Sequence, residues 1–209
     1  METVLRLSGM LALIDRWAGL PALLQRIERR SETAVAPADG AKPYLLAALQ
    51  QRLAAPILVV TARPGRAREL QEQIAIWSTS PERVILFPEP DALPYERMPA
   101  DPTATAARLF AMRQLRMAAS GSKGPSTLVV ASARAVMERL MSPDELDRSV
   151  ERLRVGGRLP LQATLRRWVE MGYRHAAIVE TPGSFSRRGG ILDIFPTGSQ
   201  VPFRIELFG

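Results

Sequence analysis

The run Pro56-Ile57-Leu58-Val59-Val60-Thr61 decides how the first part of the chain folds. It is apolar at nearly every position and rich in valine and isoleucine, which is typical of a strand covered on both faces. Two similar runs follow, Val84-Ile85-Leu86-Phe87 and Thr127-Leu128-Val129-Val130. Helical periodicity separates the three runs, at residues 69–77 and 102–117. Strands that alternate with helices predict a helicase-like α/β layer with a parallel sheet.

The pattern changes after Ser142. An amphipathic helix is expected at residues 161–169, and short strand-like runs follow at 178–179, 190–195 and 203–208. Turn-forming residues separate these runs at hairpin spacing, which predicts a small antiparallel sheet. The last run alternates apolar and charged residues, so one face of that strand should be buried and the other wet.

We therefore expect two domains of different class, a helicase-like α/β domain over residues 1–150 and a small α+β domain over residues 151–209. The first 35 residues read as helix, with an interruption at Leu20-Pro21. Gly209 follows directly on the last predicted strand, so the small domain looks truncated and the chain looks like a piece of a longer protein.

Composition excludes several classes of chemistry. The 209 residues contain no cysteine, which rules out disulfides, thiolate metal sites and thiol catalysis. The only histidine, His175, rules out any site that needs two imidazoles. The sequence has neither an apolar run of membrane-spanning length nor a secretory signal, so we expect a soluble, cytoplasmic protein without membrane contact.

The charge balance is basic and dominated by arginine. The net charge is +7, and all basic residues except Lys42 and Lys123 are arginines. Arginine is suited to bidentate recognition of carboxylates and phosphates, although a compositional bias is the simpler explanation of such a chain. The positive charge is densest after residue 150, where Arg166/Arg167 and Arg187/Arg188 lie. An acidic partner is indicated without being identified.

The predicted α/β layer lacks the residues that hold a nucleotide. A phosphate-binding loop needs glycines followed by Lys-Ser/Thr between a strand and a helix. Residues 62–66 follow the first strand with a single glycine and no such pair. Residues 121–126 precede a strand instead, and Pro125 lacks an N–H group. Asp144-Glu145 is expected to cap a helix. We therefore expect no cofactor, no metal and no catalytic residue in this chain.

Two segments carry a family resemblance. The stretch Phe87-Pro88-Glu89-Pro90-Asp91-Ala92-Leu93-Pro94-Tyr95-Glu96-Arg97, followed by Arg108-Leu109, resembles a segment of bacterial transcription-repair coupling factors. The pattern Arg188-Gly189-Gly190-Ile191-Leu192-Asp193-Ile194-Phe195, followed by Arg204-Ile205-Glu206-Leu207-Phe208-Gly209, resembles the region that this family shares with the repair protein UvrB. The resemblance spans roughly residues 55–209, and the missing phosphate loop favours the coupling factors over UvrB.

This resemblance implies a non-catalytic, UvrB-like module at the N-terminus of a large ATP-driven DNA translocase. Such a module recruits UvrA to stalled RNA polymerase in transcription-coupled nucleotide excision repair. The resemblance places ATP, magnesium, DNA and RNA polymerase with the full-length family protein, and it leaves UvrA and the other domains of that protein as partners of this chain.

The family pattern maps the UvrA-binding surface onto Arg188, Arg204 and Phe208. Residues 204 and 208 share one face of a strand, and arginine and aromatic residues are common interface anchors. If that face is wet, Ile205 and Leu207 are core residues. If Phe208 is core instead, Arg204 is merely solvated. His175 and Ser186 stand where UvrB-type proteins tend to have basic residues, so the resemblance does not carry over whole.

Three other functions are weighed against UvrA recruitment. A DNA-binding module would follow from the basic charge and would show affinity that falls steeply with salt. A UvrB-related repair protein and an ATPase are the other two, and the missing phosphate loop disfavours both.

Overall fold

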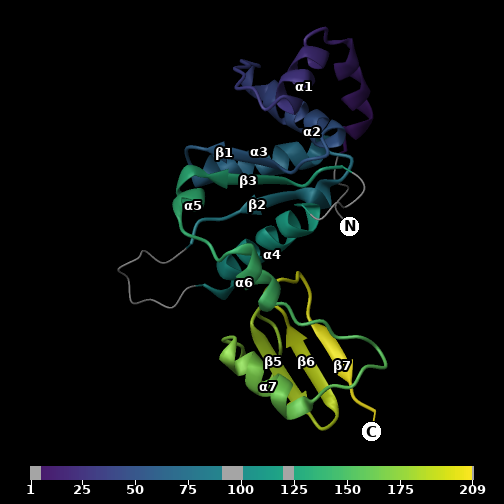
Figure 1. Cartoon of the computed structure of the whole chain (residues 1–209), viewed down its shortest axis with the longest axis vertical. Helices are drawn as coiled ribbons and strands as arrows, with labels where there is room; N and C mark the ends of the chain where they lie inside the picture. The colour runs from purple at the N-terminus through teal and green to yellow at the C-terminus, as the bar shows by residue number, and fades with distance from the viewer. Residues whose placement is uncertain (1–5, 91–100, 120–124, 209) are drawn as a thin grey trace. The chain divides into compact units, whose positions relative to one another are not determined.

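Figure 1 shows a computed structural model of the chain, which describes residues 6–90, 101–119 and 125–208. The chain forms two compact units, each built from separate stretches of sequence. The first comprises Met1–Phe87 and Met117–Arg134, and the second comprises Pro88–Arg116 and Ala135–Gly209. Each unit has its own β-sheet and its own hydrophobic cluster. The predicted domain boundary at residue 150 is a different division of the chain, and it stays a prediction.

The first unit begins with helices and continues as an α/β layer. Pro21, Pro43 and Pro64 stand in the first turns of three helices, where the missing N–H of proline is no loss. The predicted interruption at Leu20-Pro21 is therefore the start of a helix.

The elements of the first unit are η1 (Ser8–Arg16), α1 (Leu20–Glu28), η2 (Asp39–Ala41), α2 (Lys42–Arg52), β1 (Ile57–Thr61), α3 (Pro64–Trp77), η3 (Pro81–Arg83), β2 (Val84–Phe87) and β3 (Leu128–Ser132). Helices α4 (Pro102–Ala119) and α5 (Ala133–Met137) contribute residues to both units.

The sheet of the first unit is parallel, with the strand order β1-β3-β2. Val130 of β3 is in register with Val59 on one side and Leu86 on the other. All five residues of β3 are buried, as expected of the central strand of a parallel sheet. The three strands coincide with the predicted apolar runs to within two residues, so the predicted parallel α/β layer is confirmed. The prediction that the first run is covered on both faces is wrong, because β1 lies at the edge of the sheet and exposes Leu58 and Val60 to 55% and 50%.

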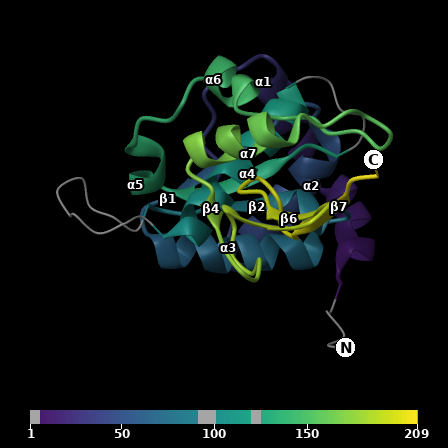
Figure 2. The same cartoon turned by 90° about the horizontal axis from the view of Figure 1, so that it is seen from below.

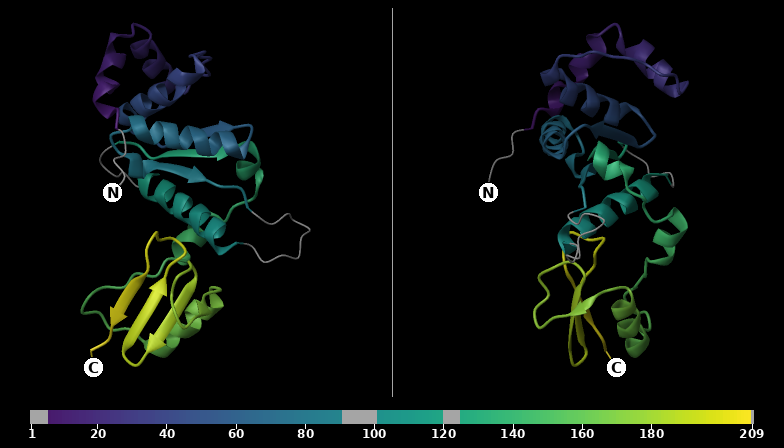
Figure 3. Two further views of the ribbon diagram at one scale, coloured as in Figure 1. Left: turned by 180° about the vertical axis from the view of Figure 1, so that it is seen from behind. Right: turned by 90° about the vertical axis from the view of Figure 1, so that its left-hand side faces the viewer.

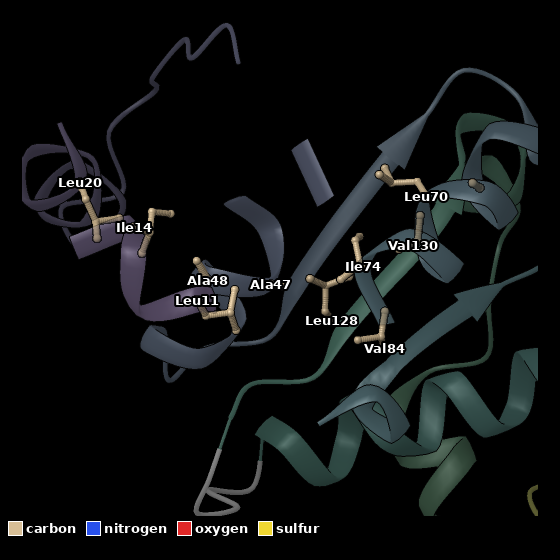
Figure 4. Close-up of a cluster of buried hydrophobic side chains, with 11 residues drawn as sticks. Leu11, Ile14, Leu20, Ala47, Ala48, Leu70, Ile74, Val84, Leu128 and Val130 are labelled. Carbon is tan, nitrogen blue, oxygen red and sulfur yellow. The ribbon is translucent and has the colours of Figure 1, made fainter. Parts of the chain in front are cut away.

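Helix α3 supplies much of the core of this unit. Ala67, Leu70 and Ile74 follow one another at helical spacing and are buried together. Figure 4 shows Leu70 and Ile74 close to Val130 and Leu128 of the central strand. The same cluster reaches into η1 and α2, so the N-terminal helices pack into the core of the α/β layer.

The second unit contains a four-stranded sheet in the order β4-β5-β6-β7. Strands β5, β6 and β7 are antiparallel, whereas β4 pairs with β5 in parallel. Helix α7 lies against one face of this sheet (Figures 2 and 3). The elements are α6 (Pro143–Arg148), α7 (Leu161–Glu170), β4 (Arg174–His175), β5 (Ser184–Arg188), β6 (Ile191–Phe195) and β7 (Phe203–Glu206).

This sheet differs from the prediction at its first two strands. No strand forms at residues 178–179, where Ile178 is exposed. Strand β5 was missed because its sequence, Ser184-Phe185-Ser186-Arg187-Arg188, contains a single apolar residue. The sheet is mixed and not purely antiparallel, because the short β4 runs parallel to β5. A separate small α+β unit with one helix on its sheet is nevertheless what the sequence predicted.

Gly189 and Gly190 form the turn that joins β5 to β6. Gly189 has a φ of +60°, a left-handed conformation that glycine adopts without steric cost. A Cβ on Gly190 would lie 3.1 Å from the carbonyl oxygen of Leu207, whose N–H donates to the Gly190 carbonyl at 2.8 Å. Two glycines therefore let the hairpin turn tightly and bring the end of β7 alongside it.

Helix α6 begins with a capping box. The Ser142 hydroxyl accepts a hydrogen bond from the Glu145 backbone N–H at 3.3 Å, and the Glu145 carboxylate accepts one from the Ser142 N–H at 2.7 Å. The bond from the Ser142 N–H, and next the bond that the Ser142 hydroxyl donates to the same carboxylate at 2.8 Å, lower the pKa of Glu145. The predicted capping role of the acids at residues 144–145 is confirmed for Glu145.

Two features singled out in the sequence fall outside the described residues. They are the Leu93-Pro94-Tyr95 part of the first family segment and residues 121–124 of the glycine-containing loop. A search of the described residues finds no helix of sufficient length and hydrophobicity to cross a membrane.

Candidate protein-binding face of the mixed sheet

The two faces of the mixed sheet differ in chemistry. On the face that α7 covers, Trp168 packs edge-on against Phe185 with 5.6 Å between ring centroids. Leu192 and Ile194 of β6 complete this cluster and are buried. Side chains alternate along a strand, so the neighbours of these residues point to the opposite face. We call that opposite side the open face.

Strand register places the polar residues of the open face in two rows. Across the sheet, the first row runs from Ser186 through Asp193 to Arg204. The next row runs from Arg188 through Ile191 to Glu206. Two of the predicted site residues, Arg188 and Arg204, therefore lie on the same face in adjacent rows.

Arg204 is held by a bidentate ion pair with Asp193. Its Nε donates to Oδ1 of Asp193 at 2.7 Å, and its Nη2 donates to Oδ2 at 3.0 Å. The Asp193 side chain is 21% exposed, whereas that of Arg204 is 59% exposed. These hydrogen bonds lower the pKa of Asp193, and the positive charges of Arg204 and Arg188 lower it further. The carboxylate is therefore ionised at neutral pH and lies beneath the guanidinium.

Arg188 is anchored by a backbone carbonyl and forms no ion pair with an acidic side chain within the described part of the chain. Its Nη2 donates to the backbone carbonyl oxygen of Ala177 at 2.7 Å. A carbonyl oxygen orients the guanidinium without neutralising it, so Arg188 presents a positive charge at the exposed end of β5. Its neighbour Arg187 is in register with Leu192, so it points to the α7 side of the sheet.

Phe208 is exposed to 89% of its surface and lies just beyond the end of β7. Ile205 and Leu207, which alternate with it, pack against the Trp168 cluster. The face that carries Arg204 is therefore the wet one, and the alternative in which Phe208 is core is wrong. Strand register places the two arginines on the same side of the sheet, and the phenyl ring is exposed just beyond the end of β7.

The two positions where the sequence departs from the UvrB pattern contribute little to this face. Ser186 belongs to the open face but is only 4% exposed. His175 is in register with Phe185 and packs edge-on against its ring at 5.6 Å between centroids, so it lies toward the α7 side. Neither side chain replaces the arginines as a prominent charged contact.

Asp193 is a residue of this face that the sequence reasoning missed. A signal was present, because opposite charges at residues 193 and 204 lie on two strands that a hairpin-like connection joins. This charge pair can be recognised only when the register of β6 and β7 is known. The part of the chain that the structure describes shows no group of three or more acidic or histidine side chains able to hold a metal ion. That the chain binds no metal or nucleotide stays a prediction.

Comparison with known proteins assigns this region to a class. Residues 152–209 match the family model of the UvrB interaction domain, and these residues include α7 and the whole mixed sheet. This part of the second unit is similar to the UvrB interaction domain, which agrees with the UvrB-like pattern of the sequence.

The relatives of the whole chain are transcription-repair-coupling factors. The chain is 33% identical over 190 residues to that of Mycobacterium tuberculosis (strain CDC 1551 / Oshkosh), which covers 90% of this chain and 15% of the relative. It is 32% identical over 171 residues to that of Bacillus subtilis (strain 168), covering 81% and 14%. It is 25% identical over 164 residues to that of Escherichia coli (strain K12), covering 78% and 14%. The chain is thus homologous to a segment of the transcription-repair-coupling factors, and it spans about 15% of their length.

Proposed function

We propose that this chain is a non-catalytic module that recruits UvrA in transcription-coupled nucleotide excision repair, and that it contacts UvrA through the open face. The observation that supports the proposal is that Arg188 and Arg204 share one face of a sheet that matches the UvrB interaction domain, with Phe208 exposed just beyond the end of β7. In this proposal ATP hydrolysis and the contacts with DNA and RNA polymerase belong to a full-length protein, which acts in the cytoplasm.

The chemistry of the open face suits an acidic protein surface with an apolar contact. Arg188 and Arg204 offer guanidinium groups with unused donors, and a planar guanidinium matches a carboxylate in two-point contact. Phe208 has 89% of its surface exposed and offers an apolar side chain for contact. Arginine and aromatic side chains are also the residues that most often dominate binding energy.

Binding of the purified chain to purified UvrA, measured by isothermal titration calorimetry, tests this proposal. Arg188→Ala, Arg204→Ala and Phe208→Ala are each expected to weaken binding about 30-fold, as anchors near an interface centre do. Arg187→Ala is the matched control, because it removes the same charge from the other face of the same strand. Full-strength binding by all three variants would refute the assignment of the site.

The basic charge supports one alternative, direct binding of DNA. The chain carries +7, and a contact with several phosphates would make log affinity fall by about 0.9 per phosphate against log salt. UvrA recruitment predicts that DNA binds far more weakly than UvrA at about 0.15 M salt. Comparable affinities would favour the DNA-binding function. Any ATP hydrolysis by the clean chain would contradict the non-catalytic role.

A further inference from the structure

Asp193 occupies an unexpected position for an acid on a face proposed to bind an acidic partner. Both of its carboxylate oxygens are engaged by Arg204, and it is much less exposed than the arginine above it. The two bonds use Nε and one Nη group of the guanidinium. The remaining edge of the same planar group is left for a second acceptor.

We propose that Asp193 is a positioning residue of the UvrA-binding face, which fixes the guanidinium of Arg204 so that its remaining edge meets a carboxylate of the partner. This inference rests on the proposed function and adds to it a residue that contributes through Arg204 and not through its own contact. A free arginine side chain samples many rotamers, and orienting it before binding removes that entropic cost from the association.

Two acidic residues lie beside Arg204, and their contacts distinguish an acid that orients the arginine from an acid that only contributes negative charge. Glu206 lies on the same face two residues from Arg204, so it also places a negative charge beside that arginine. Within the described residues the Glu206 carboxylate accepts no hydrogen bond, whereas the Asp193 carboxylate accepts two from Arg204. Asp193 and Glu206 therefore form a natural pair, one acid that orients Arg204 and one that only contributes charge.

The two roles predict opposite changes in the affinity for UvrA when the acid is replaced by its neutral amide. If acids on this face act only through their charge, removing either one makes the face more positive and strengthens the binding of an acidic partner. If Asp193 orients Arg204, its replacement weakens binding although the face becomes more positive. The ion pair is exposed and contributes little to folding, so the replacement is expected to leave the domain folded.

The experiment measures UvrA affinity of the whole chain carrying Asp193→Asn or Glu206→Gln, with circular dichroism to confirm folding. We expect Asp193→Asn to bind UvrA about tenfold more weakly, the loss typical of removing a residue that orients a contact group. Glu206→Gln is expected to bind as tightly as the unmodified chain or more tightly. Binding by Asp193→Asn that is unchanged or tighter would overturn the positioning role.

A double-mutant cycle distinguishes positioning from an independent contact. In the Arg204→Ala background, Asp193→Asn should cause no further loss, because the group that it orients is absent. A loss of the same size in both backgrounds would overturn the proposal. Arg204→Lys gives a second route if Asp193→Asn fails to fold, since lysine keeps the charge but cannot make the paired contact. It should bind about tenfold more weakly, and undiminished binding would contradict the proposal.

The failure of this inference can be told apart from the failure of the proposed function. If the unmodified chain does not bind UvrA, the proposed function is wrong. If the chain binds UvrA and loses affinity with Arg204→Ala but not with Asp193→Asn, the function stands and only the positioning role falls.

Discussion

Inner strands of the two sheets, β3 and β6, have opposite burial patterns. In the parallel sheet, all five residues of β3 are buried, so neighbouring side chains on both faces contribute to the core. In the mixed sheet, β6 alternates between fully buried and half-buried residues. A strand buried on both faces has no surface left for a partner, whereas an alternating strand keeps one face in solvent. The difference indicates where function can reside: the mixed sheet can offer a binding face, and the central strand of the parallel sheet cannot.

The largest expected effect concerns neighbouring residues on β6. Leu192 is 0% exposed within the Trp168 cluster, and Leu192→Ala should lower the free energy of unfolding by about 2–5 kcal/mol. Ile191 is half-buried on the open face, so Ile191→Ala should cost less than about 1 kcal/mol. Urea unfolding of both variants measures the difference. Equal losses would show that the open face is packed as tightly as the core.

The next effect tests the parallel sheet in the same way. Val129 and Val130 are adjacent on β3, point to opposite faces, and are 1% and 0% exposed. Val129→Ala and Val130→Ala should therefore destabilise the chain by similar amounts, about 2 kcal/mol each. The same urea titrations compare them. If one variant loses much more unfolding free energy than the other, the two faces of β3 are not equally packed, and the contrast between β3 and β6 fails.

A smaller effect is expected at the hairpin that shapes the open face. Gly189 has a φ of +60°, so Gly189→Ala should destabilise the chain by about 1 kcal/mol through backbone strain. Gly65 is the control, because it lies in the first turn of α3 with an ordinary φ and open space for a Cβ. Gly65→Ala should leave the thermal midpoint unchanged or raise it slightly. A loss at Gly65 equal to that at Gly189 would argue against the strained turn.

The smallest effect is a change in pH dependence. The folded-state pKa of Asp193 is lowered below its ordinary value of 3.8, chiefly by the hydrogen bonds from Arg204. The contribution of Asp193 to stability is therefore present above that ordinary value and is lost as the pH falls through the lowered pKa. Asp193→Asn should flatten the acid side of a plot of unfolding free energy against pH. An unchanged acid slope would mean that the ion pair does not persist in solution.

The sequence predicts the elements whose apolar pattern is strong. The three apolar runs correspond to β1, β2 and β3, and the alternation at residues 203–208 identifies both the strand and its wet face. Strand β5 escaped because its polar side chains and tight Gly189 turn carry no apolar signal. It is placed by pairing with β6, which is a tertiary effect that local propensity does not contain.

The residues of the candidate site could be predicted from the sequence, but the contacts that hold them could not. Arg188, Arg204 and Phe208 follow from the family pattern, and the structure places the two arginines on the open face and exposes Phe208 beyond the end of β7. The contact of Arg188 with the carbonyl of Ala177 and that of Arg204 with Asp193 join residues eleven positions apart. Such contacts depend on register and on the path of a loop, which the sequence alone does not specify.

Hydrogen–deuterium exchange of the chain, free and bound to UvrA, tests the central claim most directly. The account predicts that bound UvrA slows exchange in peptides that cover the end of β5 and β6–β7, from Arg188 to Phe208. Peptides that cover β1 and β3 of the parallel sheet should exchange at the same rate in both states. Protection of the parallel sheet with no change in the mixed sheet would contradict the account.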